Sequence, residues 1–146
     1  RELLDFTPES AGTDIDAALR YFADAQKKRC TAFLISDFID THDYAKAMSI
    51  ASSKHDLIAV QVYDKRDAEI PDVGLMRVVD LETGADRWLN TSAKSVRKAY
   101  SKWWYERQQQ MAAIMQKSRV DFTSIATDED FVRALMGLFK MRGVAR

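Results

Sequence analysis

Side chains with oxygen donors follow three apolar segments of the chain, and their positions suggest where chemistry could occur. Carboxylates follow all three segments: Asp37, Asp40 and Asp43, then Asp64 and Asp67, then Asp128 and Glu129. The carboxyl ends of parallel strands meet at one edge of a sheet, where α/β proteins bind ligands. Thr13 begins the helix before the first segment, so its hydroxyl can approach the same edge. Hydroxyl and carboxylate oxygens are ligands that Mg²⁺ accepts.

On residue types alone, ordinary structural roles account for these side chains. Thr13 suits a helix N-cap, and Asp37 suits a loop that follows a strand. His42 and His55 have no second His or Cys at metal-ligand spacing, so both are predicted at the surface or at an interface. No glycine-rich phosphate loop follows a strand, and there is no nucleophile elbow. Cys30 is the one cysteine, and it is predicted to be a small buried side chain.

The charge balance and hydropathy of the chain exclude some classes of partner. There are 22 Lys and Arg residues and 22 Asp and Glu residues among 146. A nucleic-acid-binding protein usually has a basic excess, so we expect no nucleic-acid partner. No apolar run approaches the roughly 20 residues that cross a bilayer, and the opening residues do not resemble a signal peptide. We therefore expect no membrane insertion by this segment and a cytoplasmic location.

Alternating helical and extended segments predict the elements that position the oxygen donors. Apolar spacing predicts a helix from Thr13, capped by that hydroxyl and by Asp16 three residues later. Residues 32–35 form an unbroken apolar run, which predicts a strand buried on both faces. A second helix is predicted from near Thr41, and a strand follows over 57–63. Strand, helix and strand with short connections predict a right-handed unit with parallel strands.

The pattern changes in the second half of the chain. A hairpin is predicted with strands over 75–80 and 87–89, and Gly84 supplies a positive φ in its turn. Residues 120–125 predict a third parallel strand. Thr127 then begins a capping box that opens a final helix. The residues that this helix is expected to bury are Phe131, Leu135 and Leu138.

A long helix is predicted between the hairpin and the third strand, over about 93–116, with a solvated turn near Arg107. Its predicted buried stripe consists of Val96, Ala99, Tyr100, Trp103, Met111 and Ile114. Adjacent side chains on a helix point in different directions, so Trp104 is expected outside this stripe. It is then either partly covered by another segment or an anchor at an interface.

Together these elements predict a three-layer, Rossmann-like α/β fold with a mostly parallel sheet and a β-hairpin insertion. The chain has no internal repeat, low-complexity stretch or linker. Residues 1–146 are therefore expected to form one domain with one core.

Several segments resemble a known family. Gly12–Ile15 and Phe33–Phe38 resemble the second half of a von Willebrand factor A domain. The blocks His55–Asp64, Glu69–Gly74 and Thr127–Phe131 look like the bacterial family called domain of unknown function 58, often encoded near MoxR-type AAA+ ATPases. The resemblance covers nearly the whole chain. It implies the C-terminal portion of a von Willebrand factor A-like domain without its first strands.

The resemblance also implies a metal site. Von Willebrand factor A domains hold a metal ion above the sheet with an Asp-x-Ser-x-Ser motif, a Thr and an Asp. Thr13 matches that Thr and Asp37 matches that Asp, so both are predicted ligands of Mg²⁺ or another divalent cation. Two departures stand out: Phe38 replaces the glycine that usually follows the Asp, and the chain has no Asp-x-Ser-x-Ser motif. The other ligands are expected upstream of Arg1, so this segment alone is not expected to bind metal tightly.

The function implied by the resemblance is a protein-binding module rather than an enzyme, working with a MoxR-type AAA+ ATPase in assembly or maturation of a partner. Without a first strand, Phe33–Ile35 would become an exposed apolar sheet edge through which two copies could pair. Two alternatives stay open. One is a metal-assisted hydrolase that uses Asp37, Asp40 and Asp43. The other is a metal-free scaffold that binds through Trp104 and the hairpin.

Overall fold

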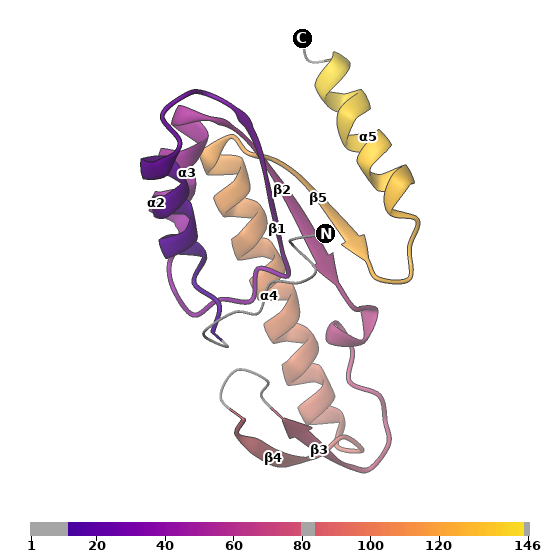
Figure 1. The fold of residues 1–146 in the computed structure, drawn as a ribbon. Coiled ribbons are helices and arrows are strands. Elements are labelled where there is room, and N and C mark those ends of the chain that lie inside the picture. The colour runs from indigo at the N-terminus through magenta and orange to yellow at the C-terminus, as the bar shows by residue number, and fades with distance from the viewer. Residues whose placement is uncertain (1–11, 80–83, 145–146) are drawn as a thin grey trace, which may run out of the picture.

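The computed structural model describes residues 12–79 and 84–144, in which helices alternate with strands (Figure 1). Each element predicted from the sequence has a counterpart in it. The elements in chain order are α2 (Ile15–Ala25), β1 (Thr31–Ser36), α3 (Ala45–Lys54), β2 (Asp56–Tyr63), the short 3₁₀ helix η1 (Lys65–Asp67), β3 (Leu75–Val79), β4 (Asp86–Asn90), α4 (Lys94–Ser118), β5 (Asp121–Ala126) and α5 (Phe131–Val144).

Three strands form a parallel sheet in the order β1-β2-β5. In the register, Ile35 lies opposite Val60, which in turn lies opposite Thr123. Strands β3 and β4 pair separately as an antiparallel hairpin. Gly84 has a φ of 69°, as predicted for its turn. The remaining turn residues, 80–83, lie outside the described part of the chain.

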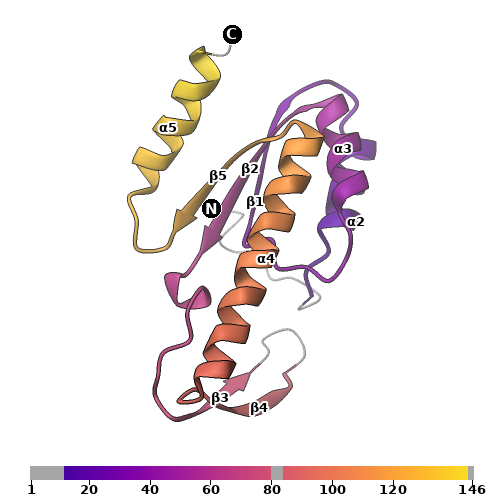
Figure 2. The same ribbon diagram turned by 180° about the vertical axis from the view of Figure 1, so that it is seen from behind.

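Helices cover both faces of the parallel sheet, which confirms the predicted three-layer, Rossmann-like arrangement (Figures 1 and 2). Helices α2, α3 and α4 lie on one face and α5 lies on the other. The larger core, on the first face, contains Ile15, Leu19, Tyr44, Met48, Leu57, Ala59, Met111 and Met115. The smaller core, beneath α5, contains Ile58, Val60, Ile125 and Leu138. Strands β2 and β5 thus divide their side chains between the two cores.

Strand β1 differs from the prediction that it is buried on both faces. Ala32 and Leu34 pack against the larger core. Phe33 and Ile35 point to the opposite face and are 49% and 65% exposed. The reason is the position of α5, whose buried side chains pack on β2 and β5 and leave β1 largely uncovered.

Helix α4 has different neighbours along its length, and this determines which tryptophan is buried. Its C-terminal half packs into the larger core through Met111 and Met115, whereas its N-terminal half extends beyond the sheet to the hairpin (Figure 2). Trp104 is 9% exposed and its ring lies 6.1 Å from the ring of Tyr63, whereas Trp103 is 43% exposed. The prediction that Trp103 is part of the buried stripe is wrong, because this half of the helix lies beyond the sheet. Trp104 is covered by another segment, which was one of its two predicted alternatives.

Three helix starts also differ from the predictions. Helix α3 begins at Ala45 rather than near Thr41, and its N-cap Tyr44 forms no capping hydrogen bond with its side chain. Asp14, rather than Thr13, is the N-cap of α2, and its carboxylate accepts a hydrogen bond from the first turn. Helix α5 begins after Asp130, which accepts a comparable bond, rather than at a cap formed by Thr127. Phe131 therefore lies in the first turn and is exposed instead of buried.

Within the described residues, no helix has the length and apolar character needed to cross a membrane.

Candidate functional site

Asp37 lies where the sequence places it, in the loop at the carboxyl end of β1, and its side chain is exposed. Its Oδ1 accepts a hydrogen bond from the Ile39 N–H at 2.9 Å, and Oγ of Ser36 accepts one from the Phe38 N–H at 3.0 Å. These two short-range bonds shape the turn and hold the Asp37 side chain. The other carboxylate oxygen, Oδ2, takes part in no hydrogen bond among the described residues.

Phe38 adopts the left-handed conformation that usually favours glycine. Its φ is 59°, although the ring is only 2% exposed and lies 6.2 Å from the ring of Tyr44. The carbonyl of Phe38 accepts a hydrogen bond from Arg107 at 3.2 Å, and the carbonyl of Asp40 accepts one from the same guanidinium at 2.8 Å. Arg107 therefore fixes the loop after β1. It is itself half-buried, although its neighbours Tyr105, Glu106, Gln109 and Gln110 are exposed, as predicted for a solvated turn near this point of α4.

Asp40 holds the start of α2 against this loop. Its Oδ2 accepts a hydrogen bond from the Ile15 N–H at 2.7 Å, and its Oδ1 accepts bonds from the backbone N–H and the Nδ1 of His42, both at 2.8 Å. Thr13 lies immediately before this helix and is half-buried. The loop after β1 and the segment that carries Thr13 are thus joined directly.

Asp14, Asp40 and His42 form a compact acidic group at this junction. Their potential metal-ligand atoms all lie within 4.8 Å of one another. Burial acts to raise the pKa of Asp40, but hydrogen bonds from His42 and Ile15 hold it below its ordinary value. The hydrogen bond to Asp40 and the charge of Asp14 raise the pKa of His42. Each carboxylate already accepts backbone hydrogen bonds, so a structural role accounts for the group.

The three carboxylates of the proposed hydrolase do not gather in one cluster. The acidic group described above contains Asp40 but neither Asp37 nor Asp43. Asp43 accepts a hydrogen bond from the Ala45 N–H at 3.0 Å, at the start of α3. Among the described residues, therefore, Asp40 and Asp43 hold backbone groups of the loop.

Thr13 and Asp37 are the two residues predicted as ligands of a divalent cation. Both offer hard oxygen donors, and neither the Thr13 hydroxyl nor Oδ2 of Asp37 has a hydrogen-bond partner among the described residues. Mg²⁺ prefers six oxygen ligands and retains several waters. Two protein ligands would leave most of that coordination to water or to another segment.

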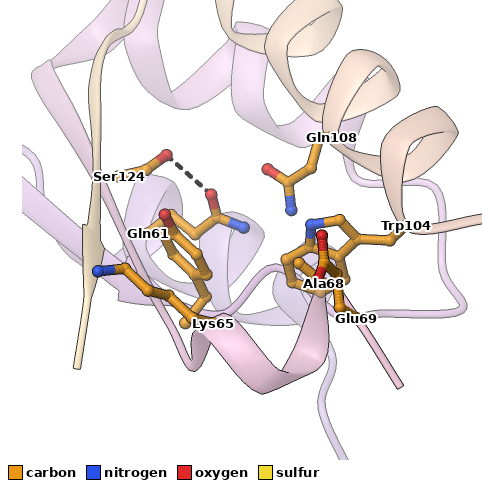
Figure 3. Close-up of a pocket in the computed structure, with 8 residues that line it drawn as sticks. Gln61, Lys65, Ala68, Glu69, Trp104, Gln108 and Ser124 are labelled. Atoms are coloured by element: carbon orange, nitrogen blue, oxygen red, sulfur yellow. Dashed lines mark hydrogen bonds between the residues drawn. The ribbon is translucent and has the colours of Figure 1, made fainter. Parts of the chain in front are cut away.

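A polar cavity lies at the carboxyl ends of β2 and β5, beneath α4 (Figure 3). Gln61 forms its floor and is 1% exposed. Its Oε1 accepts a hydrogen bond from the Ser124 hydroxyl at 2.8 Å, and its Nε2 donates to the Asp37 carbonyl at 3.3 Å. The amide thus connects the cavity with the loop that carries Asp37. The sequence reasoning missed this residue, although a glutamine inside an apolar strand is a signal of a polar interior.

The two histidines have different environments. His42 is largely exposed, as predicted. His55 is 2% exposed, so its predicted surface position is wrong. Its ring packs 4.6 Å from the ring of Phe22, and its Nδ1 lies 3.6 Å from Sγ of Cys30, which is half-buried. These residues lie at the opposite end of the sheet from Asp37.

Comparisons with known proteins place the chain among proteins without an assigned activity. Residues 1–111 match the family described as protein of unknown function DUF58. An uncharacterized protein of Mycobacterium avium, MAV169, is 24% identical over 135 residues, which cover 92% of this chain and 79% of that protein. The uncharacterized protein Rv1480 of Mycobacterium tuberculosis is 30% identical over 80 residues, which cover 55% of this chain but only 25% of Rv1480. No solved structure gave a significant match.

Proposed function

Because this chain belongs to the DUF58 family, we propose that it forms part of a von Willebrand factor A-like module that binds a partner protein through a divalent cation. Thr13 and Asp37 would be two of the cation's ligands. A carboxylate of the partner would complete the coordination, which makes binding dependent on the metal. The partner that the resemblance favours is a MoxR-type AAA+ ATPase or its client.

The observation that carries this proposal is the position of Asp37. Its exposed carboxylate stands at the carboxyl end of β1, the edge strand of the parallel sheet, with one oxygen fixed by Ile39 and the other open. In parallel sheets, ligands bind at this end of the strands. A further parallel strand beside β1 would bring its own carboxyl end, and the missing oxygen ligands, next to Asp37.

Binding rather than turnover is supported by the hydrogen bonds of Asp40. Both of its carboxylate oxygens are engaged, by the Ile15 N–H and by the N–H and Nδ1 of His42, so it is not free to complete a three-carboxylate catalytic cluster with Asp37 and Asp43. Metal-assisted hydrolysis requires a metal-bound nucleophile and a general base within hydrogen-bond reach.

Calorimetric titration of Mg²⁺ and Mn²⁺ tests the metal site. The proteins to compare are this chain and a version extended upstream by the neighbouring strand, each with and without Asp37→Asn. We expect clear binding by the extended form and its loss in Asp37→Asn. The matched control is Asp24→Asn, which removes an exposed carboxylate at the other end of the sheet and should leave binding unchanged. Absence of binding by either form would refute the metal-dependent proposal.

Partner binding is tested separately with a purified MoxR-type ATPase. We expect the extended form to bind it in Mg²⁺ and to release it on chelation, and we expect Asp37→Asn to bind weakly under both conditions. Binding that is unaffected by chelation would show that the partner uses a surface other than the metal site.

A metal-free contact surface is the second candidate, because the hairpin exposes large apolar side chains. Leu75 and Trp88 lie on it and are both about two-thirds exposed, and Trp103 of α4 lies nearby, lining a groove with Leu89. Trp104, which the sequence suggested for this role, is buried and cannot serve. Loss of partner binding in Trp88→Ala, together with unchanged binding in Asp37→Asn, would favour this candidate.

A further inference from the structure

The cavity beneath α4 is built from residues of three separate segments of the chain. It has a volume of about 480 Å³ and is lined by Gln61, Tyr63, Lys65, Ala68, Glu69, Trp104, Gln108 and Ser124. These come from β2, η1 and the loop after it, α4 and β5 (Figure 3). A concave site with a few convergent polar groups at the carboxyl end of a parallel sheet is where a small ligand is expected.

The walls of the cavity combine aromatic rings with hydrogen-bonding groups. The rings of Tyr63 and Trp104 lie 6.1 Å apart at an angle of 43°. Gln108 directs its amide into the same space from α4, beside the Gln61 amide (Figure 3). Aromatic faces attract cations because of their negative π surface, and amide oxygens accept hydrogen bonds from N–H donors.

The charges around the cavity also favour a cation. Glu69 lines the cavity, is exposed, and forms no ion pair among the described residues. The ammonium of Lys65 lies 3.0 Å from Asp128 and 3.2 Å from Glu129, so two carboxylates offset its single charge. Hydrogen bonds to these two residues raise the pKa of Lys65, which keeps it charged within that group. The carboxylates of Glu69, Asp128 and Glu129 therefore outnumber the one ammonium, that of Lys65, in and beside the cavity.

Other classes of ligand fit this lining less well. An anion would meet Glu69, and the Lys65 ammonium that could attract it is already paired with Asp128 and Glu129. A purely apolar ligand would cover the Gln108 amide without offering it a partner, which is unfavourable for a polar group that becomes buried.

We propose that this cavity binds an organic ammonium group, which would lie against the rings of Tyr63 and Trp104 with its charge directed toward Glu69. The ammonium can come from a free amine or from a lysine side chain of a partner protein, since both present the same chemistry. The proposal does not depend on the metal site, because it involves neither Thr13 nor Asp37.

The test is a titration followed by NMR, with the indole N–H of Trp104 as the reporter. The probes are n-butylammonium, n-butanol and butyrate, which are similar in size and differ in charge. We expect n-butylammonium to shift the Trp104 signal in a saturable manner at millimolar concentrations, and n-butanol and butyrate to shift it little. Trp104→Phe, which removes the signal, assigns it among the three tryptophans.

A neutral substitution of Glu69 tests whether its charge contributes to the binding of the ammonium. We expect Glu69→Gln to weaken n-butylammonium binding about three- to tenfold, the range for loss of one partly solvated ion pair. Asp24→Asn, which removes an exposed carboxylate far from the cavity, is the matched control and should leave the affinity unchanged. Equal shifts with n-butanol, unchanged affinity in Glu69→Gln, or no saturable shift with any probe would overturn the proposal.

The source of the ammonium follows from a second pair of probes. Free lysine carries a second ammonium and a carboxylate, whereas lysine blocked at both ends mimics the residue within a protein. Tighter binding of blocked lysine would support a partner's side chain as the ligand, and tighter binding of free lysine would support a metabolite. In both cases, acetylation of the ε-amine should abolish binding, because acetylation removes the positive charge.

Discussion

Phe38 is a residue at which two physical demands conflict. Its φ of 59° lies in the left-handed region, which costs an L-residue other than glycine about 1–2 kcal/mol. Its ring is nevertheless buried against Tyr44 in the larger core, where a phenylalanine contributes about 3–5 kcal/mol relative to alanine. The gain from burial exceeds the cost of the backbone, which explains how phenylalanine can occupy a position typical of glycine.

This balance predicts an unusual order of stability for two substitutions. Phe38→Ala and Phe38→Gly should both lower the free energy of unfolding by several kcal/mol, because both remove the buried ring. Phe38→Gly should be the more stable of the two by about 1 kcal/mol, because glycine relieves the left-handed strain. Urea denaturation at low temperature measures the difference.

A matched pair in α4 provides the control for this order. Ala113 is exposed within the helix, where glycine is destabilising by about 1 kcal/mol relative to alanine. At position 113, glycine should therefore be less stable than alanine, whereas at position 38 glycine should be more stable than alanine. If Phe38→Ala is as stable as Phe38→Gly or more so, the backbone at this position is not left-handed in solution.

The hydrogen bonds between Asp40 and His42 predict how stability depends on pH. The pKa of His42 is raised above its ordinary 6.5, so its contribution is complete below that pH and is lost as the pH rises through the folded-state pKa. The pKa of Asp40 is lowered from its ordinary 3.8, so its contribution is present above that pH and is lost as the pH falls through the folded-state pKa. Both contributions are present between these two ordinary values.

His42→Gln tests the alkaline side of this window. The variant cannot gain a proton, so its stability should lack the decline that the original chain shows as the pH rises above 6.5. Thermal unfolding of both proteins across the neutral range gives the difference, in which contributions of all other titrating groups cancel. Parallel curves for the two proteins would show that His42 does not stabilise the fold through its charge.

At the scale of elements, the sequence predicted the order and type of the strands and helices because their patterns are local. The apolar runs of β1 and β2 and the periodicity of α2 depend on neighbouring residues only. Burial of a particular side chain depends on distant segments instead. Trp103 was wrongly predicted to be buried because nothing local shows that α4 extends from the sheet to the hairpin.

The candidate site could be predicted to a similar extent. Asp37 was placed correctly at the end of a strand, since strand ends follow from the apolar pattern. The connection from Asp40 to Ile15 spans 25 residues, and that from Gln61 to Ser124 spans 63. Such contacts arise from the packing of the sheet and helices, so the cavity and the acidic group were visible only in the structure.

Helix α5 is the one helix on its face of the sheet within the described residues, and an ion-pair group holds its C-terminal end. Arg142 donates to both carboxylate oxygens of Asp56, at 2.7 and 2.6 Å, and lies 3.0 Å from Asp121. The side chain of Arg142 is 14% exposed, so these interactions are partly shielded from water. They connect the end of the helix to the starts of β2 and β5.

Arg142→Gln should loosen this helix without unfolding the rest of the molecule. We expect the free energy of unfolding to fall by about 1–3 kcal/mol, the range for hydrogen bonds to charged groups. Amide hydrogen exchange should become faster in α5, while exchange in α2 and α3 should change little. Arg133→Gln, an exposed arginine of the same helix without an ion pair among the described residues, is the control. Equal effects of the two substitutions would contradict an anchoring role for Arg142.

At the scale of the whole molecule, the face of the sheet beside α5 carries a continuous apolar surface. Phe33 and Ile35 supply its β1 side, and the flank of α5 supplies Val132, Met136 and Phe139, which recur at helical spacing and are exposed. The rings of Phe33 and Phe139 lie 6.4 Å apart, which joins the two sides. This surface borders the outer edge of β1. Strand β1 pairs with β2 on its inner side, and no strand among the described residues pairs with its outer edge.

An apolar surface next to an open strand edge favours association between chains, because backbone hydrogen bonds and apolar contacts can form together. We therefore expect this chain to form dimers as its concentration rises, detected as an increase in mass by light scattering. Ile35→Lys should keep the chain monomeric, because a charge on the edge strand opposes pairing of β1 with a second copy. Val73→Lys, which places the same charge on an exposed residue near the hairpin, should leave dimerisation intact. A chain that stays monomeric at the highest attainable concentration would exclude this edge as a self-association surface, and equal effects of the two lysines would place the interface elsewhere.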